Sequence, residues 1–173
     1  MKTADLTFEA LVNAYSGDLY RYAYWLCKEA SLAEDLVQET FMRAWKALDK
    51  LENPAAAKAW LFTILRRELA RHLSKQKFDT VSLDMLLDSE QLALESSEIG
   101  KIEHWVLQRA LKEMSHDYLE PLLLQVIAGY SCEEIADILS MKTGAVMTRV
   151  YRARQQLRQY LTNDALSKKR VTS

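Results

Sequence analysis

The chain has 173 residues and a net charge of −1, and 49% of its residues are hydrophobic. That apolar fraction is ample for helical cores and excludes an intrinsically disordered chain. Only four glycines and two prolines occur, among plentiful Leu, Ala, Glu, Lys and Arg, so the composition predicts an all-α protein.

The sequence also limits the compartment and the kinds of site that we expect. It has no apolar run long enough to span a membrane and no signal-peptide pattern at its start, so we expect a cytoplasmic protein. Cys27 and Cys132 lie far apart and outside any C-x-x-C pattern, which argues against zinc or a structural disulfide. His72, His104 and His116 have no metal-ligand spacing either, so no metal or other cofactor is expected.

Apolar residues at helical spacing predict an opening helix over about residues 6–28, in which Gly17 marks a candidate bend. Tyr20, Tyr22, Tyr24 and Trp25 make this helix unusually aromatic. Aromatic rings can stack on bases, but packing against neighbouring helices explains most of them at least as well. Tyr20 and Tyr24 are spaced i,i+4 and could instead form an exposed strip for a partner.

A second helix is predicted over residues 31–48, where Ser31 and Glu34 have the spacing of a capping box. Its apolar side carries Leu36, Val37, Thr40, Phe41, Ala44 and Trp45, and another face carries Asp35, Gln38, Glu39, Met42 and Lys46. The ordinary interpretation of that second face is a solvated acidic surface near a helix start. Its carboxylates make a poor active site, because no histidine, nucleophile or pocket signal accompanies them.

Residues 51–54 form a turn, with Pro54 suited to the first position of a helix that runs from Ala55 to about Gln76. Trp60, Leu61, Ile64, Leu65, Leu69 and Leu73 form its packing side, and Arg66, Arg67, Arg71, His72, Lys75 and Lys77 make it basic. Basic residues interleaved with aromatic ones suit single-stranded DNA, although core packing is the favoured interpretation of Trp60. Residues 77–101 then form an acidic, Ser-rich linker, with transient helices expected around 83–87 or 90–94.

Two further helices are predicted around residues 102–114 and 118–128, the second ended by Gly129. A helix-turn-helix follows over residues 129–161, with a capping box at Ser131 and Glu134 and with Thr143 as the N-cap of its second helix. Residues 163–173 are expected to be a frayed polar tail.

The last helix has two contrasting faces. Val146, Val150, Ala153, Leu157 and Leu161 form its apolar stripe, and Ala145, Thr148, Arg152, Gln155 and Gln159 face the other way, flanked by Arg149, Arg154 and Arg158. Such a helix fits a major groove, with early residues on base edges, arginines on phosphates and the amides of Gly144 and Ala145 near a phosphate. A basic solvated helix in an ordinary bundle fits the periodicity equally well.

The strings G-x-S-x-x-E-I-A-x-x-L and T-G-x-V-x-T-R-V-Y-R-A-R-x-x-L resemble the DNA-binding C-terminal domain of extracytoplasmic-function sigma factors. About a hundred residues earlier, A-E-D-L-V-Q-E-T-F-x-R-A-W is similar to the helix by which sigma factors hold the clamp of RNA polymerase. The segment A-W-L-F-T-I-L-R-R-E resembles the one that melts the promoter −10 element. Arg67 stands where the family often has Asn, which leaves the −10 base preference open.

The resemblance implies two helical domains, a region-2-like one over residues 1–76 and a region-4-like one over residues 102–162. It implies polymerase contacts by Asp35, Gln38, Glu39 and Met42; −10 contacts by Asn53, Trp60, Arg66, Arg67 and Arg71; and −35 contacts by Thr143, Gly144, Ala145, Thr148, Arg149, Arg152 and Arg154. Thr148 and Arg152 are the expected base readers. The expected partners are core RNA polymerase, promoter DNA and an anti-sigma factor. The anti-sigma factor could hold the chain at a membrane, although the chain itself is not expected to insert.

Two other classes remain open from the residues alone. A stand-alone helix-turn-helix regulator would bind duplex DNA without polymerase, but it gives no reason for the Asp35–Glu39 motif. A sequestering adaptor would not need Arg149 or Arg152 at all. An enzyme is the least supported class, because no nucleophile, phosphate loop or metal set occurs in the sequence.

Overall fold

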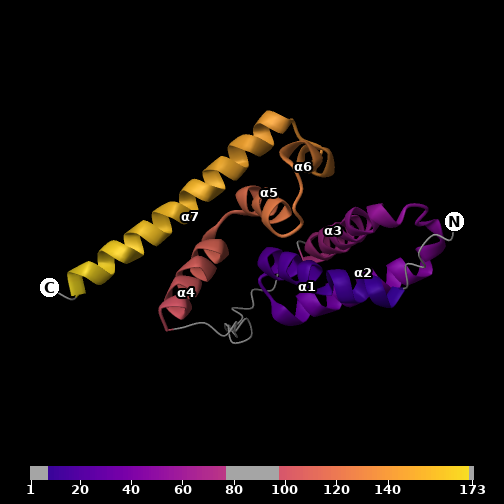
Figure 1. Cartoon of the computed structure of the whole chain (residues 1–173), viewed down its shortest axis with the longest axis horizontal. Coiled ribbons are helices and arrows are strands. Elements are labelled where there is room, and N and C mark those ends of the chain that lie inside the picture. The colour runs from indigo at the N-terminus through magenta and orange to yellow at the C-terminus, as the bar shows by residue number, and fades with distance from the viewer. Residues whose placement is uncertain (1–7, 77–97, 172–173) are drawn as a thin grey trace.

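The computed structural model describes residues 8–76 and 98–171, with side chains placed over 8–75 and 105–163. Its α-helices are α1 (Phe8–Cys27), α2 (Ala30–Lys46), α3 (Ala57–Gln76), α4 (Glu98–Glu113), α5 (His116–Val126), α6 (Cys132–Leu139) and α7 (Thr143–Val171) (Figure 1). Two 3-10 turns, η1 (Leu48–Lys50) and η2 (Pro54–Ala56), separate α2 from α3. The described ranges contain no strand, which confirms the all-α prediction. Of the predicted linker, residues 77–97 and both transient helices lie outside the described part, and 98–101 begin α4.

Helices α1, α2 and α3 form the N-terminal group, held by a core in which Leu19, Ala33, Leu61 and Leu65 are fully buried. Helix α1 runs through Gly17 without a break. Its aromatic residues divide between core and surface. Tyr22 and Trp25 are buried, and Tyr22 packs edge-to-face on Phe62 with ring centroids 5.3 Å apart. The rings of Tyr20 and Tyr24 are half-buried and stacked at 6.1 Å, so only this pair could form a surface strip.

The start of α2 differs from the prediction. Lys28 adopts a left-handed backbone with φ 61°, and Glu29, at φ −138° and ψ 122°, is the N-cap. Ser31 is therefore already inside the helix, and its hydroxyl donates to Glu29 Oε1 at 3.0 Å instead of capping an amide. The capping box predicted at Ser31 and Glu34 is wrong, because the helix begins before it.

Helices α4 to α7 form the C-terminal group, as predicted, although some boundaries differ. Helix α5 ends at Val126, and Gly129 takes the left-handed conformation, φ 78°, that turns the chain toward α6. Thr143 is the first residue of α7 and not its cap, because the amides of Ala145 and Val146 already donate to the Lys142 carbonyl. The backbone of residues 163–171 continues α7, where the sequence predicted a frayed tail.

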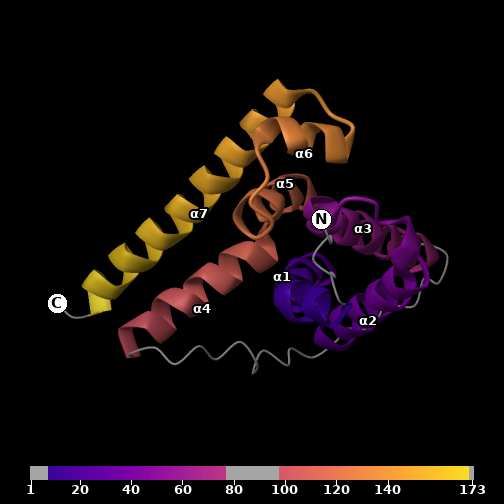
Figure 2. The ribbon, with the colours of Figure 1, turned by 45° about the vertical axis from the view of Figure 1, so that its right-hand side comes forward.

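The two groups are not separate bodies in this structure. Figures 1 and 2 show α5 beside α1 and α3, while α4 and α7 extend away from the N-terminal group. A continuous cluster of buried residues runs from Leu19 and Leu61 in one group to Leu119 and Ile135 in the other. The fold therefore brings the helix-turn-helix against the basic helix α3.

Candidate functional site

Helix α2 presents one exposed face of mixed polarity. Asp35 and Gln38 are exposed, Glu39 is half-exposed, and Met42 is 54% exposed in their midst. Trp45, predicted on the apolar side of α2, is 61% exposed, since only one side of its indole packs, on Phe8 with ring centroids 5.0 Å apart. Large apolar side chains beside carboxylates are typical of a protein-binding surface. All four residues predicted to contact polymerase lie on this face.

A chain of charged residues links α2 to α3. The Nε atom of Arg43 lies 2.8 Å from Glu39 Oε1 and 2.7 Å from Glu68 Oε1, and Arg71 Nη1 lies 3.1 Å from Glu68 Oε2. Glu68 is buried, with both carboxylate oxygens occupied. Its carboxylate therefore ties a predicted polymerase-binding residue, Glu39, to a predicted promoter-binding residue, Arg71.

The residues predicted for the −10 element do not all share one surface. Asn53 is exposed, and its side chain caps the turn η2 by accepting from the Ala55 amide at 3.0 Å. Arg67 and Arg71 are exposed and Trp60 is half-buried on α3. Arg66 points elsewhere, because its Nε donates to Glu120 Oε1 at 2.8 Å and its Nη1 donates to the Ile138 carbonyl at 3.0 Å. In this arrangement Arg66 is bound to the C-terminal group.

The predicted capping box at the start of α6 is present. The Glu134 amide donates to Ser131 Oγ at 3.2 Å, and the Ser131 amide donates to Glu134 Oε2 at 2.8 Å. Ile135 and Ala136 are buried together with Val146 of α7, so the cap fixes the short helix on which the recognition helix rests. Ser140, with φ 53°, supplies the left-handed turn between α6 and α7.

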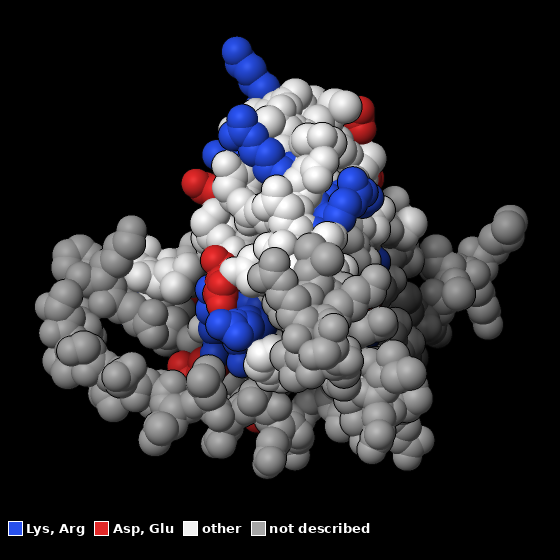
Figure 3. Space-filling view, turned by 90° about the vertical axis from the view of Figure 1, so that its left-hand side faces the viewer, with Lys and Arg blue, Asp and Glu red and all other residues white. Residues whose placement is uncertain are grey.

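The face of α7 predicted to read DNA is open. Gly144, Ala145, Thr148 and Arg152 are exposed, and Thr143 is half-exposed. Figure 3 shows several groups of Lys and Arg, with fewer Asp and Glu, on the described part of one side of the molecule. Three of the described arginines of α7 have partners on the surface: Arg149 pairs with Asp117 at 3.5 Å, Arg152 with the Tyr118 hydroxyl at 3.4 Å, and Arg154 with Gln125 at 2.6 Å.

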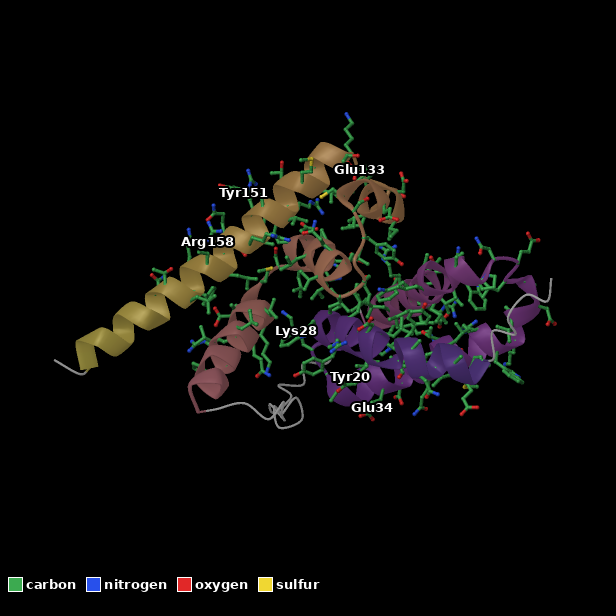
Figure 4. All side chains as sticks on the ribbon, in the orientation of Figure 1. Tyr20, Lys28, Glu34, Glu133, Tyr151 and Arg158 are labelled. Atoms are coloured by element: carbon green, nitrogen blue, oxygen red, sulfur yellow. The ribbon has the colours of Figure 1, made fainter. Side chains whose placement is uncertain are left out.

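Two exposed apolar residues of α7 were missed from the sequence. Met147 is 57% exposed and Tyr151 is 62% exposed. Figure 4 shows Tyr151 and Arg158 on the outer side of α7, away from α4 and α5. Met147 and Tyr151 lie beside Thr148 and Arg152 on a helical wheel, so the same wheel could have predicted that these two apolar residues are exposed. Apolar side chains beside base readers can contact thymine methyl groups in a major groove.

The described residues contain no group of His, Cys, Asp or Glu able to hold a metal ion, and both cysteines are free and half-buried. No described helix is long and apolar enough to cross a membrane. What the described surface offers is binding: a polar and apolar face on α2, and a basic helix-turn-helix.

Comparison with known proteins identifies the family of both groups of helices. Residues 11–78 match the Sigma-70 region 2 family and residues 104–157 match Sigma-70, region 4. The chain is 33% identical to RNA polymerase sigma factor SigV of Bacillus subtilis, over 96% of this chain and 100% of that one. It is 30% identical to the ECF RNA polymerase sigma factor SigL of Mycobacterium tuberculosis, over 86% and 85% of the two chains. The chain belongs to the extracytoplasmic-function sigma factors.

Solved structures share the arrangement of both groups of helices in this sigma factor. The sigma factor RpoE from Bartonella quintana, in complex with the anti-sigma factor NepR, is 32% identical over 90% of this chain and 96% of that one, with a TM-score of 0.72. CnrH, in complex with the cytosolic domain of CnrY, is 25% identical over 91% and 88% of the two chains, with a TM-score of 0.61. The sigma factor described here is accordingly a non-catalytic transcription initiation factor that acts with core RNA polymerase at promoters.

Proposed function

We propose that one of the two exposed surfaces of this sigma factor binds polymerase and that the other binds DNA. The region-2-like domain, residues 1–76, binds core polymerase through the α2 face of Asp35, Gln38, Glu39 and Met42. The region-4-like domain, residues 102–162, binds the −35 element through α7. The observation that carries the proposal is the exposed α2 face, whose Met42 and Trp45 have no structural reason to remain in water.

Within the region-4-like domain, Thr148 and Arg152 read bases, because both are exposed at the early turns of α7 that enter a major groove. Arg149 and Arg154 on the flanks hold phosphates, and the exposed first turn at Thr143, Gly144 and Ala145 meets a phosphate through its amides. Each good base contact contributes about 1–3 kcal/mol of discrimination.

Within the region-2-like domain, Arg67 and Arg71 hold the −10 strand on the exposed side of α3, with Trp60 and Asn53 at its start. Arg66 can join them only when it leaves Glu120. Two weakly binding domains on one chain gain affinity by effective concentration once both elements lie on the same DNA.

We also propose that an anti-sigma factor binds this chain and covers these surfaces. The support is that both solved relatives with the same arrangement of helices are complexes, one with NepR and one with the cytosolic domain of CnrY. An exposed apolar and acidic face on α2 and a basic face on α7 give such a partner two chemically different contacts.

The test of the polymerase surface is a pull-down with purified bacterial core RNA polymerase. The variant Asp35→Ala/Gln38→Ala/Glu39→Ala removes two carboxylates and one amide from the α2 face. The control Asn13→Ala/Asp49→Ala/Glu52→Ala removes the same groups from exposed positions elsewhere in the domain. We expect wild type and control to bind and the α2 variant not to bind, with equal helix content by circular dichroism. Equal binding by all three would refute the assignment of this face.

A further inference from the structure

A surface hollow of about 360 Å³ lies between the first turn of α5 and the early turns of α7. It is lined by Asp117 and Tyr118 of α5 and by Ala145, Thr148, Arg149 and Arg152 of α7. All four α7 residues are assigned to −35 DNA, whereas neither α5 residue has a role so far. Every residue that lines the hollow belongs to the C-terminal group, so the hollow is a feature of the DNA-binding domain itself.

Tyr118 connects the core of this domain to the hollow. It is half-buried, and its ring packs against the cluster of buried residues that holds the helices together. The next residue, Leu119, is fully buried and fixes the same turn of α5. A tyrosine side chain has only two torsions, so packing of the ring also fixes the hydroxyl. The hollow thus has a hydroxyl at a defined position beside the DNA-reading face of α7.

Arg152 is the residue that this hydroxyl contacts. Arg152 is exposed on α7, and its Nη1 donates to the Tyr118 hydroxyl at 3.4 Å. A guanidinium has five N–H donors, so one contact leaves enough donors for a bidentate contact to a base edge. The acceptor is a hydroxyl and not a carboxylate, so the contact restricts the arginine without neutralising it.

The other two arginines on these turns have different partners and different expected tasks. Arg149 lies 3.5 Å from Asp117, a side chain that is 75% exposed, so water screens the pair. Arg154 donates to Gln125 at 2.6 Å. Both are assigned to phosphates, which carry no sequence information, whereas base contacts specify the sequence. Of the three, Arg152 is the one that needs an accurate orientation, and its partner is a ring anchored in the core.

We propose that Tyr118 is a positioning residue for base reading, in which its hydroxyl orients Arg152 toward the base edge without itself contacting DNA. The proposal rests on the proposed base contact of Arg152. Ordering a flexible side chain opposes binding, and holding it in its bound orientation beforehand removes that cost. An arginine held in one orientation meets a matching base, and it cannot swing to another base or to a phosphate. The hydroxyl therefore raises discrimination more than it raises affinity.

The test uses the whole chain assembled with purified core RNA polymerase. Wild-type holoenzyme first selects its preferred sites from a random-sequence duplex library, and sequencing of the bound DNA defines the −35 probe. Fluorescence anisotropy with that duplex and with its single-base-pair variants then gives the discrimination at each pair. The proteins compared are wild type, Tyr118→Phe, Arg152→Ala and the double variant. Tyr160→Phe is the matched control, since it removes a hydroxyl of the same domain that contacts Glu113 of α4 instead.

We expect Arg152→Ala to abolish the preference at one or two neighbouring base pairs. Tyr118→Phe should weaken the preference at those same pairs by about 2- to 10-fold, the range of one neutral hydrogen bond, and leave the other pairs unchanged. In the Arg152→Ala background, Tyr118→Phe should have no further effect. The salt dependence of Tyr118→Phe should equal that of wild type, because no phosphate contact is removed. Tyr160→Phe should discriminate as wild type does.

Three results would overturn the positioning role: an unchanged preference in Tyr118→Phe, an equal loss at every base pair, or a loss that persists without Arg152. A change in stability alone gives the last of these, because it lowers binding in both backgrounds, so the cycle separates folding from positioning. An Arg152→Ala variant with wild-type preference at every pair contradicts the proposed base contact of Arg152, and the role of Tyr118 with it. Loss of preference in Arg152→Ala, with wild-type behaviour of Tyr118→Phe, contradicts the positioning role alone.

Discussion

The buried carboxylate of Glu68 is expected to stabilise the N-terminal domain by joining α2 to α3. Glu68→Gln keeps the shape of the side chain, removes the charge and turns an amide NH₂ toward one of the two arginines. A hydrogen bond to a charged group contributes about 1.5–3 kcal/mol. Since Arg43 and Arg71 are 43% and 52% exposed, water screens both pairs. We therefore expect the free energy of unfolding to fall by about 1–2 kcal/mol in total.

Urea denaturation followed by circular dichroism measures this change, with an unchanged m-value if only stability is affected. Glu34→Gln is the matched control, because it makes the same substitution at an exposed position of α2. Arg71 also loses its anchor in Glu68→Gln, so promoter opening should weaken while the variant remains folded. A free energy of unfolding within about 0.5 kcal/mol of wild type, the range of ordinary surface substitutions, would refute the proposed role of Glu68.

Three further changes test other parts of the molecule. Ser131→Ala removes one half of the capping box of α6, and we expect a loss of about 1 kcal/mol in urea denaturation. Arg152→Ala should lower discrimination for −35 duplex DNA by about 1–3 kcal/mol in anisotropy titrations and leave stability within about 0.5 kcal/mol. Tyr22→Phe should be less stable than wild type at neutral pH. Burial and Glu120 raise the pKa of the folded Tyr22, so its hydroxyl contributes below pH about 10 and this contribution is lost as pH rises through the folded value.

Each of these predictions has an outcome that contradicts it. An unchanged urea midpoint for Ser131→Ala would mean that the capping box does not stabilise α6. Equal affinity of Arg152→Ala and wild type for −35 and scrambled duplexes would remove Arg152 from the base readers. A difference between Tyr22→Phe and wild type that widens above pH about 10 would contradict the sign of the pKa shift.

The helices and the helix-turn-helix could be predicted because their signals are local. The capping box at Ser131 and Glu134 depends on residues three apart, and it is present. The predicted stripe of α7 depends on one helical period: Val146, Val150 and Ala153 are buried and Leu157 is half-buried, but Leu161 is 43% exposed. The similar pattern at Ser31 failed for an equally local reason. The left-handed backbone of Lys28 starts α2 at Ala30, and no sequence rule places a lysine in that conformation.

The surfaces of the site were also predictable one helix at a time, but their relation in space was not. Trp45 belongs to the apolar side of α2 by its period, yet its indole is exposed because α1 covers only part of it. Arg66 and Glu120 are 54 positions apart, and Glu120 lies in a segment whose pattern indicates only a core helix. A pair of this kind depends on how two domains meet, which helical periodicity does not encode.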